Sequence, residues 1–314
     1  MRSFVLLLVL AIGFFFIAAF LITGLLPGEI ISESRALFLV ILISASLALS
    51  AFLFGLITDD YSWVNRLWST APILYAWIYA LKSGLNGWSV AGAFLVTIWG
   101  ARLTYNFARK GGYSGTEDYR WPILKEKIAH PFFWQLFNLL FISMFQIGLL
   151  ILFTAPAVRL SGSSQNPRLG IAAVVLFLAF LLIETVADQQ QWNFHKAKHR
   201  AQADGSVITT VEHQADISRG FLSSGLFSLV RHPNYLGELG VWWSFFLFGA
   251  AHGGYLLHWS LTGPVVLSML FLVSTWFTES ITAGKYPEYA DYQARVPAIV
   301  PIKLNGAVTQ EEEV

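Results

Sequence analysis

The stretch LVRHPNYLGELGVWW, residues 229–243, leads from a polar turn into a very apolar segment. Pro233 has no backbone N–H and fits the first turn of a helix, while it pushes His232 before it toward an extended conformation. The motif therefore predicts a helix entrance. The free N–H groups and partial positive charge of a helix start, together with the guanidinium of Arg231, favour a phosphate or pyrophosphate as ligand.

Glu238 is the most informative residue of this entrance, because ionisable side chains are costly inside an apolar membrane helix. Asn234 and Glu238 lie four residues apart and share a helix face, which Trp242 continues. Arg231 and Tyr235 alone would fit an interfacial anchor, with Glu238 paired locally. We favour a functional role over that alternative.

The composition of the whole chain predicts an integral membrane protein. Of the 314 residues, 55% are hydrophobic and 12% are charged, whereas soluble domains have about 25% charged residues. Apolar stretches of about 20 residues, the length that crosses a bilayer, recur along the chain. The net charge of +1 argues against nucleic acid as a partner, and the absence of cysteine excludes disulfides, thiolate metal sites and cysteine nucleophiles.

The expected fold is all-α, because a helix satisfies its own backbone hydrogen bonds in lipid, and it is a polytopic transmembrane bundle of about seven or eight spans. The predicted spans are residues 4–26, 36–57, 67–82, 88–108, 132–157, 169–191, 235–257 and 262–282. The side with both termini holds 15 of the 20 Lys and Arg residues, the other side holds 4, and Arg102 lies within a span. The positive-inside rule then places both termini, and any chemistry, on the cytoplasmic side.

Two further helix ends carry polar residues at helical spacing. In WGARLTYNFARKGG, Arg102, Tyr105 and Arg109 share one face, and Arg102 lies deep enough to need a protein or ligand partner. In LLIETVADQQQWNFH, Glu184 and Asp188 stack on successive turns, where they could accept hydrogen bonds from ribose hydroxyls or neutralise arginines.

Metal binding is the weaker interpretation of these carboxylates, because no second pair or histidine at helical spacing accompanies them. His195 and His199 are four residues apart, but the cations around them in HKAKHR favour a solvated basic helix, with phosphate contact as the functional alternative. We therefore expect no metal site. The chain also lacks the glycine-rich and catalytic motifs of soluble nucleotide-binding domains and hydrolases.

The tail sequence GKYPEYADYQARVPAIVP contains Lys285 and the tyrosines at 286, 289 and 292. If the helices close into a bundle, this segment lies over the other motifs. Its tyrosines could stack on a flat ring, although an interfacial aromatic belt predicts them equally well.

Taken together, GLFSLVRHPNYLGELGVWW, ETVADQQ and KYPEYADYQARVPAIVP resemble the carboxyl-terminal half of the steroid 5α-reductase-like membrane proteins, and the whole chain is similar to their bacterial branch. The resemblance implies a helical bundle in the bacterial inner membrane, with a cavity for NADPH that opens to the cytoplasm. It also implies reduction of an activated carbon–carbon double bond in a lipid or steroid-like substrate. The related isoprenylcysteine carboxyl methyltransferases have a similar Arg-His-Pro helix entrance but use S-adenosylmethionine.

The resemblance also implies roles for individual residues. Asp188 and His195 match positions that face the cofactor, Asn234 and Glu238 match the turn beside the nicotinamide, and Arg102 matches the arginine of the central helix. The full set of predicted cofactor-binding residues is Arg102, Arg109, Glu184, Asp188, His195, Arg231, Asn234, Tyr235, Glu238, Lys285, Tyr289 and Tyr292.

The chain departs from the reductases where they hold the substrate carbonyl. They have a tyrosine three residues before the central arginine and a glutamate in the preceding helix, and the matching positions here are Trp99 and the Asn65-Arg66 pair. We expect Tyr105 or Arg66 to donate a hydrogen bond to the carbonyl oxygen during hydride transfer from NADPH.

The expected organisation is a pair of transmembrane helices in residues 1–58, a reductase-like catalytic domain in 59–304 and an acidic tail in 305–314. The expected partners are membrane lipids and a hydrophobic small-molecule or lipid substrate, without an obligate protein partner. An S-adenosylmethionine-dependent methyltransferase is the alternative enzyme. A transporter is disfavoured, because the polar clusters lie on one side and no repeat is evident. A purely structural membrane protein is the remaining alternative.

Overall fold

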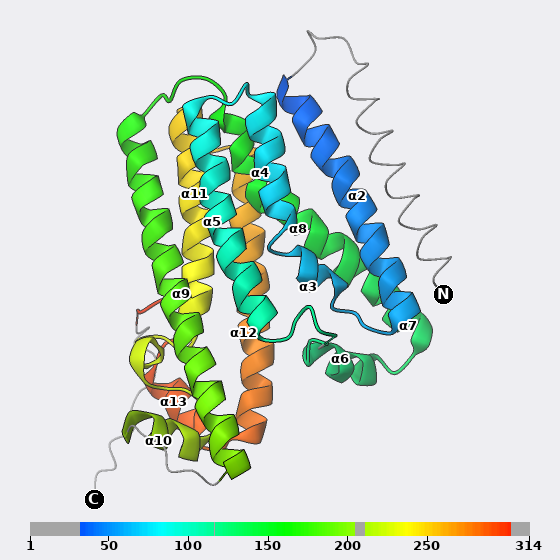
Figure 1. Ribbon diagram of the computed structural model, residues 1–314, viewed down its shortest axis with the longest axis vertical. Coiled ribbons are helices and arrows are strands. Elements are labelled where there is room, and N and C mark those ends of the chain that lie inside the picture. Colours follow the sequence, from blue (N-terminus) through cyan, green and yellow to red (C-terminus); the bar gives the residue numbers. More distant parts are fainter. Residues whose placement is uncertain (1–31, 116, 205–210, 303–314) are drawn as a thin grey trace, which may run out of the picture. The chain divides into compact units, whose positions relative to one another are not determined.

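The computed structural model describes residues 32–115, 117–204 and 211–302, and every regular element in these ranges is a helix (Figure 1). In chain order the elements are α2 (Ser32–Thr58), α3 (Trp63–Leu67), α4 (Ala71–Lys82), α5 (Gly87–Arg109), α6 (Arg120–Ile128), α7 (Pro131–Phe137), the π-helix η1 (Asn138–Phe145), α8 (Gln146–Thr154), η2 (Ala155–Leu160), α9 (Pro167–Asp204), α10 (Val211–Arg219), η3 (Gly225–Ser228), α11 (Pro233–Gly253), η4 (Trp259–Leu261), α12 (Thr262–Lys285) and α13 (Tyr289–Arg295). The first predicted span, residues 4–26, lies outside the described residues.

Four helices within the described residues are long and apolar enough to cross a membrane. They are Arg35–Thr58, Pro131–Leu160, Pro167–Gln202 and Trp259–Lys285. These helices coincide with four of the predicted spans and are characteristic of an integral membrane protein. The predicted spans 88–108 and 235–257 correspond to α5 and α11, which do not meet the same criteria. For the predicted span 67–82 the structure has α4, whose 12 residues extend about 18 Å.

The chain divides into two compact units. Unit 1 comprises residues 1–178 and 241–267, and unit 2 comprises residues 179–240 and 268–314. Three helices, α9, α11 and α12, contribute to both units. The division predicted at residues 58 and 304 follows other criteria and stays a prediction.

Unit 1 is organised around buried aromatic side chains. The rings of Trp99 and Trp242 meet edge to face with centroids 4.7 Å apart, and Phe153 lies 4.0 Å from Trp242. All three side chains are fully buried. Trp99 is therefore a core residue of unit 1.

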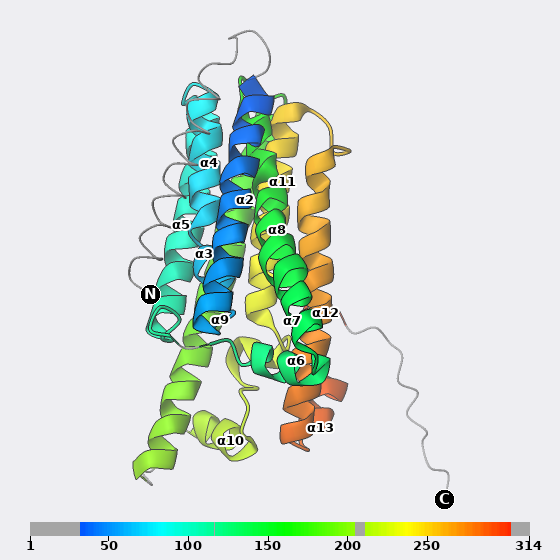
Figure 2. The ribbon, with the colours of Figure 1, turned by 90° about the vertical axis from the view of Figure 1, so that its right-hand side faces the viewer.

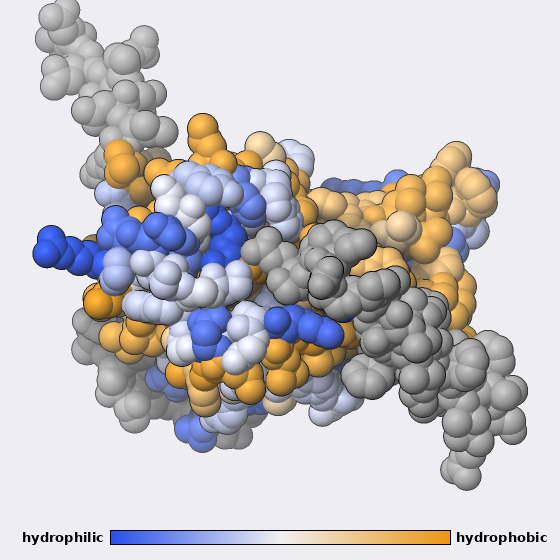
Figure 3. All heavy atoms as spheres, turned by 90° about the horizontal axis from the view of Figure 1, so that it is seen from above, coloured by the Kyte–Doolittle hydropathy of each residue, from blue (hydrophilic) through white to orange (hydrophobic). Residues whose placement is uncertain are grey.

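The outer surface of unit 1 is apolar along its helices. Large apolar side chains of α4 and α5 are exposed, among them Leu74, Leu81, Phe94 and Ile98. Figure 3 looks onto the end of unit 1 where α4 gives way to α5, with hydrophilic residues gathered on that face and hydrophobic residues along much of its rim. Contiguous exposed apolar surface of this kind suits lipid contact.

Unit 2 combines helix ends with a small set of tail elements. Figures 1 and 2 show α10 beside the carboxyl-terminal part of α9, and α13 beside the end of α12. The buried residues Ala187, Phe194, Leu222 and Phe227 form one small core. The buried residues Phe221, Tyr289 and Tyr292 form another.

Helix α9 is longer than the hydrocarbon core of a bilayer is thick. Its 38 residues extend about 57 Å, whereas the hydrocarbon core of a bilayer is about 30 Å thick. The apolar residues of α9 precede Glu184, and the polar sequence DQQQWNFHKAKHR follows at 188–200. The carboxyl-terminal part of α9 therefore extends beyond the hydrocarbon.

Candidate functional site

The helix entrance predicted from the RHP motif is present, since α11 begins at Pro233. The two residues before it are fixed by the tail of the chain. The backbone N–H of Arg231 donates to the carbonyl of Pro297 at 2.9 Å, and that of His232 donates to the carbonyl of Ala298 at 2.9 Å. Residues 231–232 and the segment after α13 are thus joined by two backbone hydrogen bonds.

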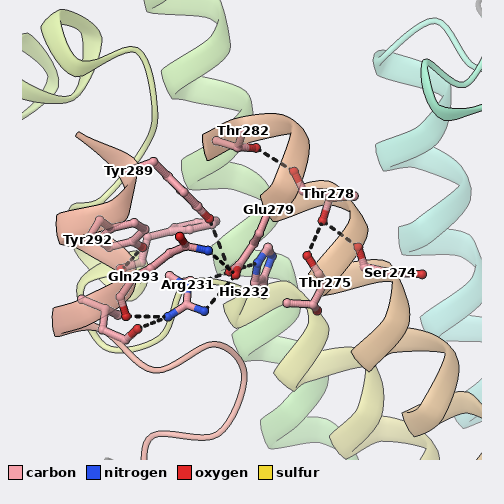
Figure 4. Close-up of polar contacts among 12 residues, drawn as sticks. Arg231, His232, Ser274, Thr275, Thr278, Glu279, Thr282, Tyr289, Tyr292 and Gln293 are labelled. Atoms are coloured by element: carbon pink, nitrogen blue, oxygen red, sulfur yellow. Dashed lines mark hydrogen bonds and ion pairs between the residues drawn. The ribbon is translucent and has the colours of Figure 1, made fainter. Parts of the chain in front are cut away.

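Glu279 of α12 is the centre of the polar network at this entrance (Figure 4). Arg231 forms a bidentate ion pair with it, from Nε to Oε1 at 2.6 Å and from Nη2 to Oε2 at 2.9 Å. The ring of His232 lies 2.8 Å from Oε1, and the side-chain amide of Gln293 donates to Oε2 at 2.8 Å. Because Glu279 is only 6% exposed, one buried carboxylate holds three segments together.

The guanidinium of Arg231 is almost fully used by these contacts. Its Nη1 donates to the backbone carbonyls of Gln293 and Val296, in addition to the two bonds to Glu279. Four of the five guanidinium N–H groups therefore have protein acceptors. A phosphate at Arg231, as the sequence predicts, would have to share or displace Glu279.

The tyrosines of the tail belong to the core of unit 2. Tyr289 and Tyr292 are 5% and 4% exposed and pack against Phe221, with ring centroids 5.0 and 5.4 Å away. Burial raises the pKa of both phenols. A ligand ring could stack on either tyrosine only if the side chains that bury it moved. Tyr235 instead stacks on the ring of His232, with centroids 5.0 Å apart.

The second polar feature of unit 2 is the contact between α9 and α11. A Cβ atom added to Gly237 would lie 2.5 Å from the Cβ and 2.8 Å from the Cα of Glu184. One added to Gly240 would lie 2.1 Å from the ring of Phe180. Only glycine permits this approach, and the order of the contacts shows that the two helices run antiparallel.

Three carboxylates are buried on these two helices. Glu184 and Glu238 are each 4% exposed and Asp188 is 5% exposed. Glu238 follows the glycine that touches Glu184, and Asp188 is one turn further along α9, so the three belong to the same crossing. Among the described residues, no group of His, Cys, Asp and Glu has the arrangement of a metal site. We call this feature the carboxylate crossing.

The remaining predicted residues of unit 2 lie at its surface. His195 and Lys285 are exposed, and Asn234 is half-buried. His195 contacts the ring of its neighbour Phe194, with centroids 5.3 Å apart. The exposed residues His195 and Lys285 thus lie on the carboxyl-terminal part of α9 and at the end of α12.

Four predicted residues belong to unit 1. Arg66 donates to the carboxylate of Asp60 at 2.6 Å and to the carbonyl of Gly112 at 3.1 Å. Arg109 donates twice to the side-chain oxygen of Asn106, which is buried, and its guanidinium lies 5.5 Å from the ring centroid of Tyr105. Tyr105 is 67% exposed. Arg102 is half-buried on the same helix.

Comparison with known proteins places these features in a family. Residues 51–296 match the family described as "Protein of unknown function (DUF1295)". The chain belongs to the DUF1295 family. A relative in Schizosaccharomyces pombe, "Uncharacterized protein C594.04c", is 36% identical over 261 residues, which cover 80% of this chain and 75% of the yeast protein. No solved structure matches the chain.

The DUF1295 match includes every side chain of the polar networks described above. It extends over every predicted site residue, from Arg66 to Tyr292, and over Glu279. Glu279 was not among the residues predicted from the sequence. Its position inside the apolar helix of TWFTESITAG was the available signal, by the same argument that singled out Glu238.

Proposed function

We propose that this DUF1295 protein is a membrane-embedded reductase that uses NADPH to reduce an activated carbon–carbon double bond of a lipid or steroid-like substrate. The carboxylate crossing is the observation that carries the proposal. Glu184, Asp188 and Glu238 are only 4–5% exposed, and ionisable side chains inside apolar membrane helices are costly and mark candidate functional sites. The resemblance of the surrounding motifs to the steroid 5α-reductase-like proteins supplies the chemistry.

The residues of unit 2 fit NADPH by the groups they offer. Ribose hydroxyls and a carboxamide donate hydrogen bonds, and carboxylates such as those of Asp188 and Glu238 can accept them. The amide of Asn234 can both donate and accept. Phosphates need cations, and the exposed part of α9 offers His195, Lys196, His199 and Arg200. Because Arg231 is held by Glu279, its role in the proposal is to fix the helix entrance that carries Asn234.

Bound NADPH would supply the hydride, and the protein would orient the reactants, exclude water and polarise the substrate. Of the two predicted donors, Tyr105 is the better candidate, since Arg66 is held by Asp60 while the phenol of Tyr105 is exposed. Donation of a hydrogen bond from the Tyr105 hydroxyl to the substrate carbonyl stays a prediction from the sequence. One oriented donor of this kind contributes roughly 3–4 kcal/mol as negative charge develops on the oxygen.

Cofactor binding is the direct test. The full chain in detergent should gain thermal stability with NADPH and gain less with NADH, and Asp188→Asn and Glu238→Gln should each reduce the gain. Glu288→Gln is the matched control, because Glu288 is an exposed carboxylate of the same unit. Stabilisation by S-adenosylmethionine instead of NADPH would favour the methyltransferase alternative, and equal responses to NADPH and NADH would contradict the reductase.

The proposal also places the carboxyl-terminal end of α9 in the cytoplasm of a bacterial cell, with both termini on the same side. Because the chain has no cysteine, single cysteines can report on topology. Ser163→Cys precedes α9 and Ser218→Cys lies in α10, and both positions are exposed. In intact spheroplasts, a membrane-impermeant maleimide should label the first and spare the second. The reverse pattern would contradict the orientation.

A further inference from the structure

Three segments of unit 2 meet at the ammonium group of Lys198. This residue lies on the extended part of α9, and its Nζ donates to the backbone carbonyl of Gly220 at 2.7 Å and to the hydroxyl of Tyr286 at 2.9 Å. Gly220 follows α10 and Tyr286 follows α12. The contact therefore joins residues 22 and 88 positions away from Lys198.

Gly220 is required for this arrangement. Its φ of +88° is in the left-handed region, and an added Cβ would lie 2.3 Å from the ring of Tyr286. A larger residue would be strained in the backbone and would push the phenol away from Lys198. The turn after α10 thus fixes the position of both the carbonyl and the tyrosine ring.

Lys198, Lys285 and Tyr286 together present hydrogen-bond donors and positive charge. Lys198 uses two of its three N–H bonds, and the Tyr286 hydroxyl accepts one of them. Among the described residues, none accepts the hydrogen of the Tyr286 hydroxyl. Lys285 adds a second ammonium group, 5.4 Å from the Tyr286 ring centroid. The hydrogen bond from Lys198 lowers the pKa of Tyr286 against a smaller opposing effect of burial, and the charge of Lys285 acts in the same direction.

The surrounding residues strengthen the positive charge. The exposed side chains of α9 nearest in sequence are His195, Lys196, His199 and Arg200. Asp216 of α10 is fully buried and accepts hydrogen bonds from Arg219, Ser223 and Ser224, so it does not neutralise Lys198. The tail carboxylates Glu288 and Asp291 are exposed to solvent, and none of the described contacts joins them to Lys198.

We propose that Lys198, Lys285 and the Tyr286 hydroxyl form a binding site for a phosphate group. A phosphate oxygen can accept from an ammonium N–H and from a phenol at once, and it matches a site that offers donors without acceptors. Two sources carry this group, the 2′-phosphate that distinguishes NADPH from NADH and the headgroup of an anionic lipid. The nucleotide source rests on the proposed function, whereas the lipid source does not.

The test compares how the full chain and its matched variants bind phosphate ligands. Binding of 2′,5′-ADP is titrated in detergent, and thermal stability is compared in nanodiscs with phosphatidic acid and with phosphatidylcholine alone. Lys285→Gln and Tyr286→Phe should each weaken binding about tenfold for whichever ligand the unsubstituted protein binds. This is the effect of one charge-assisted hydrogen bond. Lys82→Gln removes an exposed lysine at the end of α4 and should leave the binding unchanged.

The outcomes separate this site from the reductase proposal. Loss of 2′,5′-ADP binding in the variants supports the site and its nucleotide source. A response to phosphatidic acid alone supports the site with a lipid source, even if NADPH does not bind at all. If neither ligand binds to the unsubstituted protein, or if the two variants respond as Lys82→Gln does, Lys198 and Tyr286 only join α9 to the tail and the proposal fails.

Discussion

The polar networks of the two units are built in different ways. In unit 1, acidic residues pair with bases one to one near the surface: Asp60 with Arg66, Asp118 with Arg120, and Asp59 with Lys125. In unit 2, one buried carboxylate, that of Glu279, accepts contacts from Arg231, His232 and Gln293, which are 14 to 48 residues away in sequence. From this comparison we expect burial and the number of partners, rather than the number of ion pairs, to set how much stability is lost when a carboxylate is removed.

Removing Glu279 should produce the largest effect. Glu279→Ala leaves the guanidinium of Arg231 buried without its counter-ion, and breaking a buried pair in this way costs about 3–5 kcal/mol. We expect a large fall in the thermal midpoint of the purified protein in detergent. The exposed Glu288→Ala, on the next segment, should change stability by less than about 0.5 kcal/mol. Similar midpoints for the two variants would refute the central role of Glu279.

The helix contact under the carboxylate crossing should come next. Gly237→Ala places a Cβ against the backbone of Glu184, and the overpacking should cost about 1–3 kcal/mol. Gly284→Ala is the control, because nothing lies within 4 Å of its added Cβ and the residue is in the last turns of α12. Denaturant unfolding of the two variants measures the difference. A Gly237→Ala protein as stable as Gly284→Ala would show that α9 and α11 do not need their close approach.

Asp118 of unit 1 should show a smaller effect that depends on pH. Burial favours the neutral carboxyl, but the hydrogen bonds and charge of Arg120, together with Asn65, outweigh it and lower the pKa of Asp118. Its contribution is therefore present above the unfolded pKa near 3.8 and is lost as the pH falls through the lower folded value. Asp118→Asn should cost about 1 kcal/mol at pH 7. Thermal midpoints of the two proteins should converge below pH 4, and a constant gap would contradict the assignment.

The exposed pair of Asp59 and Lys125 should matter least. Their side chains are 72% and 44% exposed, and the hydrogen bond from Lys125 lowers the pKa of Asp59. Solvent screens such pairs, so Lys125→Gln should change stability by less than about 0.5 kcal/mol at any salt concentration. A larger loss that disappears in high salt would show that the one-to-one pairs of unit 1 act as a network.

Local features of the fold were predictable from the sequence. Pro233 correctly marked the start of α11, and the apolar runs at 36–57, 132–157 and 262–282 coincide with helices long enough to cross a membrane. Both signals depend on residues that are close in sequence. The short helices α6 and α10 were not predicted, because each has fewer than ten residues and their sequences are polar.

The long-range contacts of the candidate site could not be predicted from the sequence. Arg231 looked available for phosphate, and the structure gives it Glu279, 48 residues away, as its partner. Likewise, the tyrosines at 289 and 292 have the spacing of an aromatic belt, yet their burial depends on Phe221. Periodicity assigns a residue to a helix face, but it does not reveal which side chain of a distant segment lies opposite that face.

The unbroken course of α9 sets a scale for any ligand of unit 2. Asp188 of the carboxylate crossing and Lys198 are ten residues apart on this one helix, which corresponds to about 15 Å along its axis. A compact metabolite can therefore contact only one of these two residues, and only a long, flexible molecule can contact both.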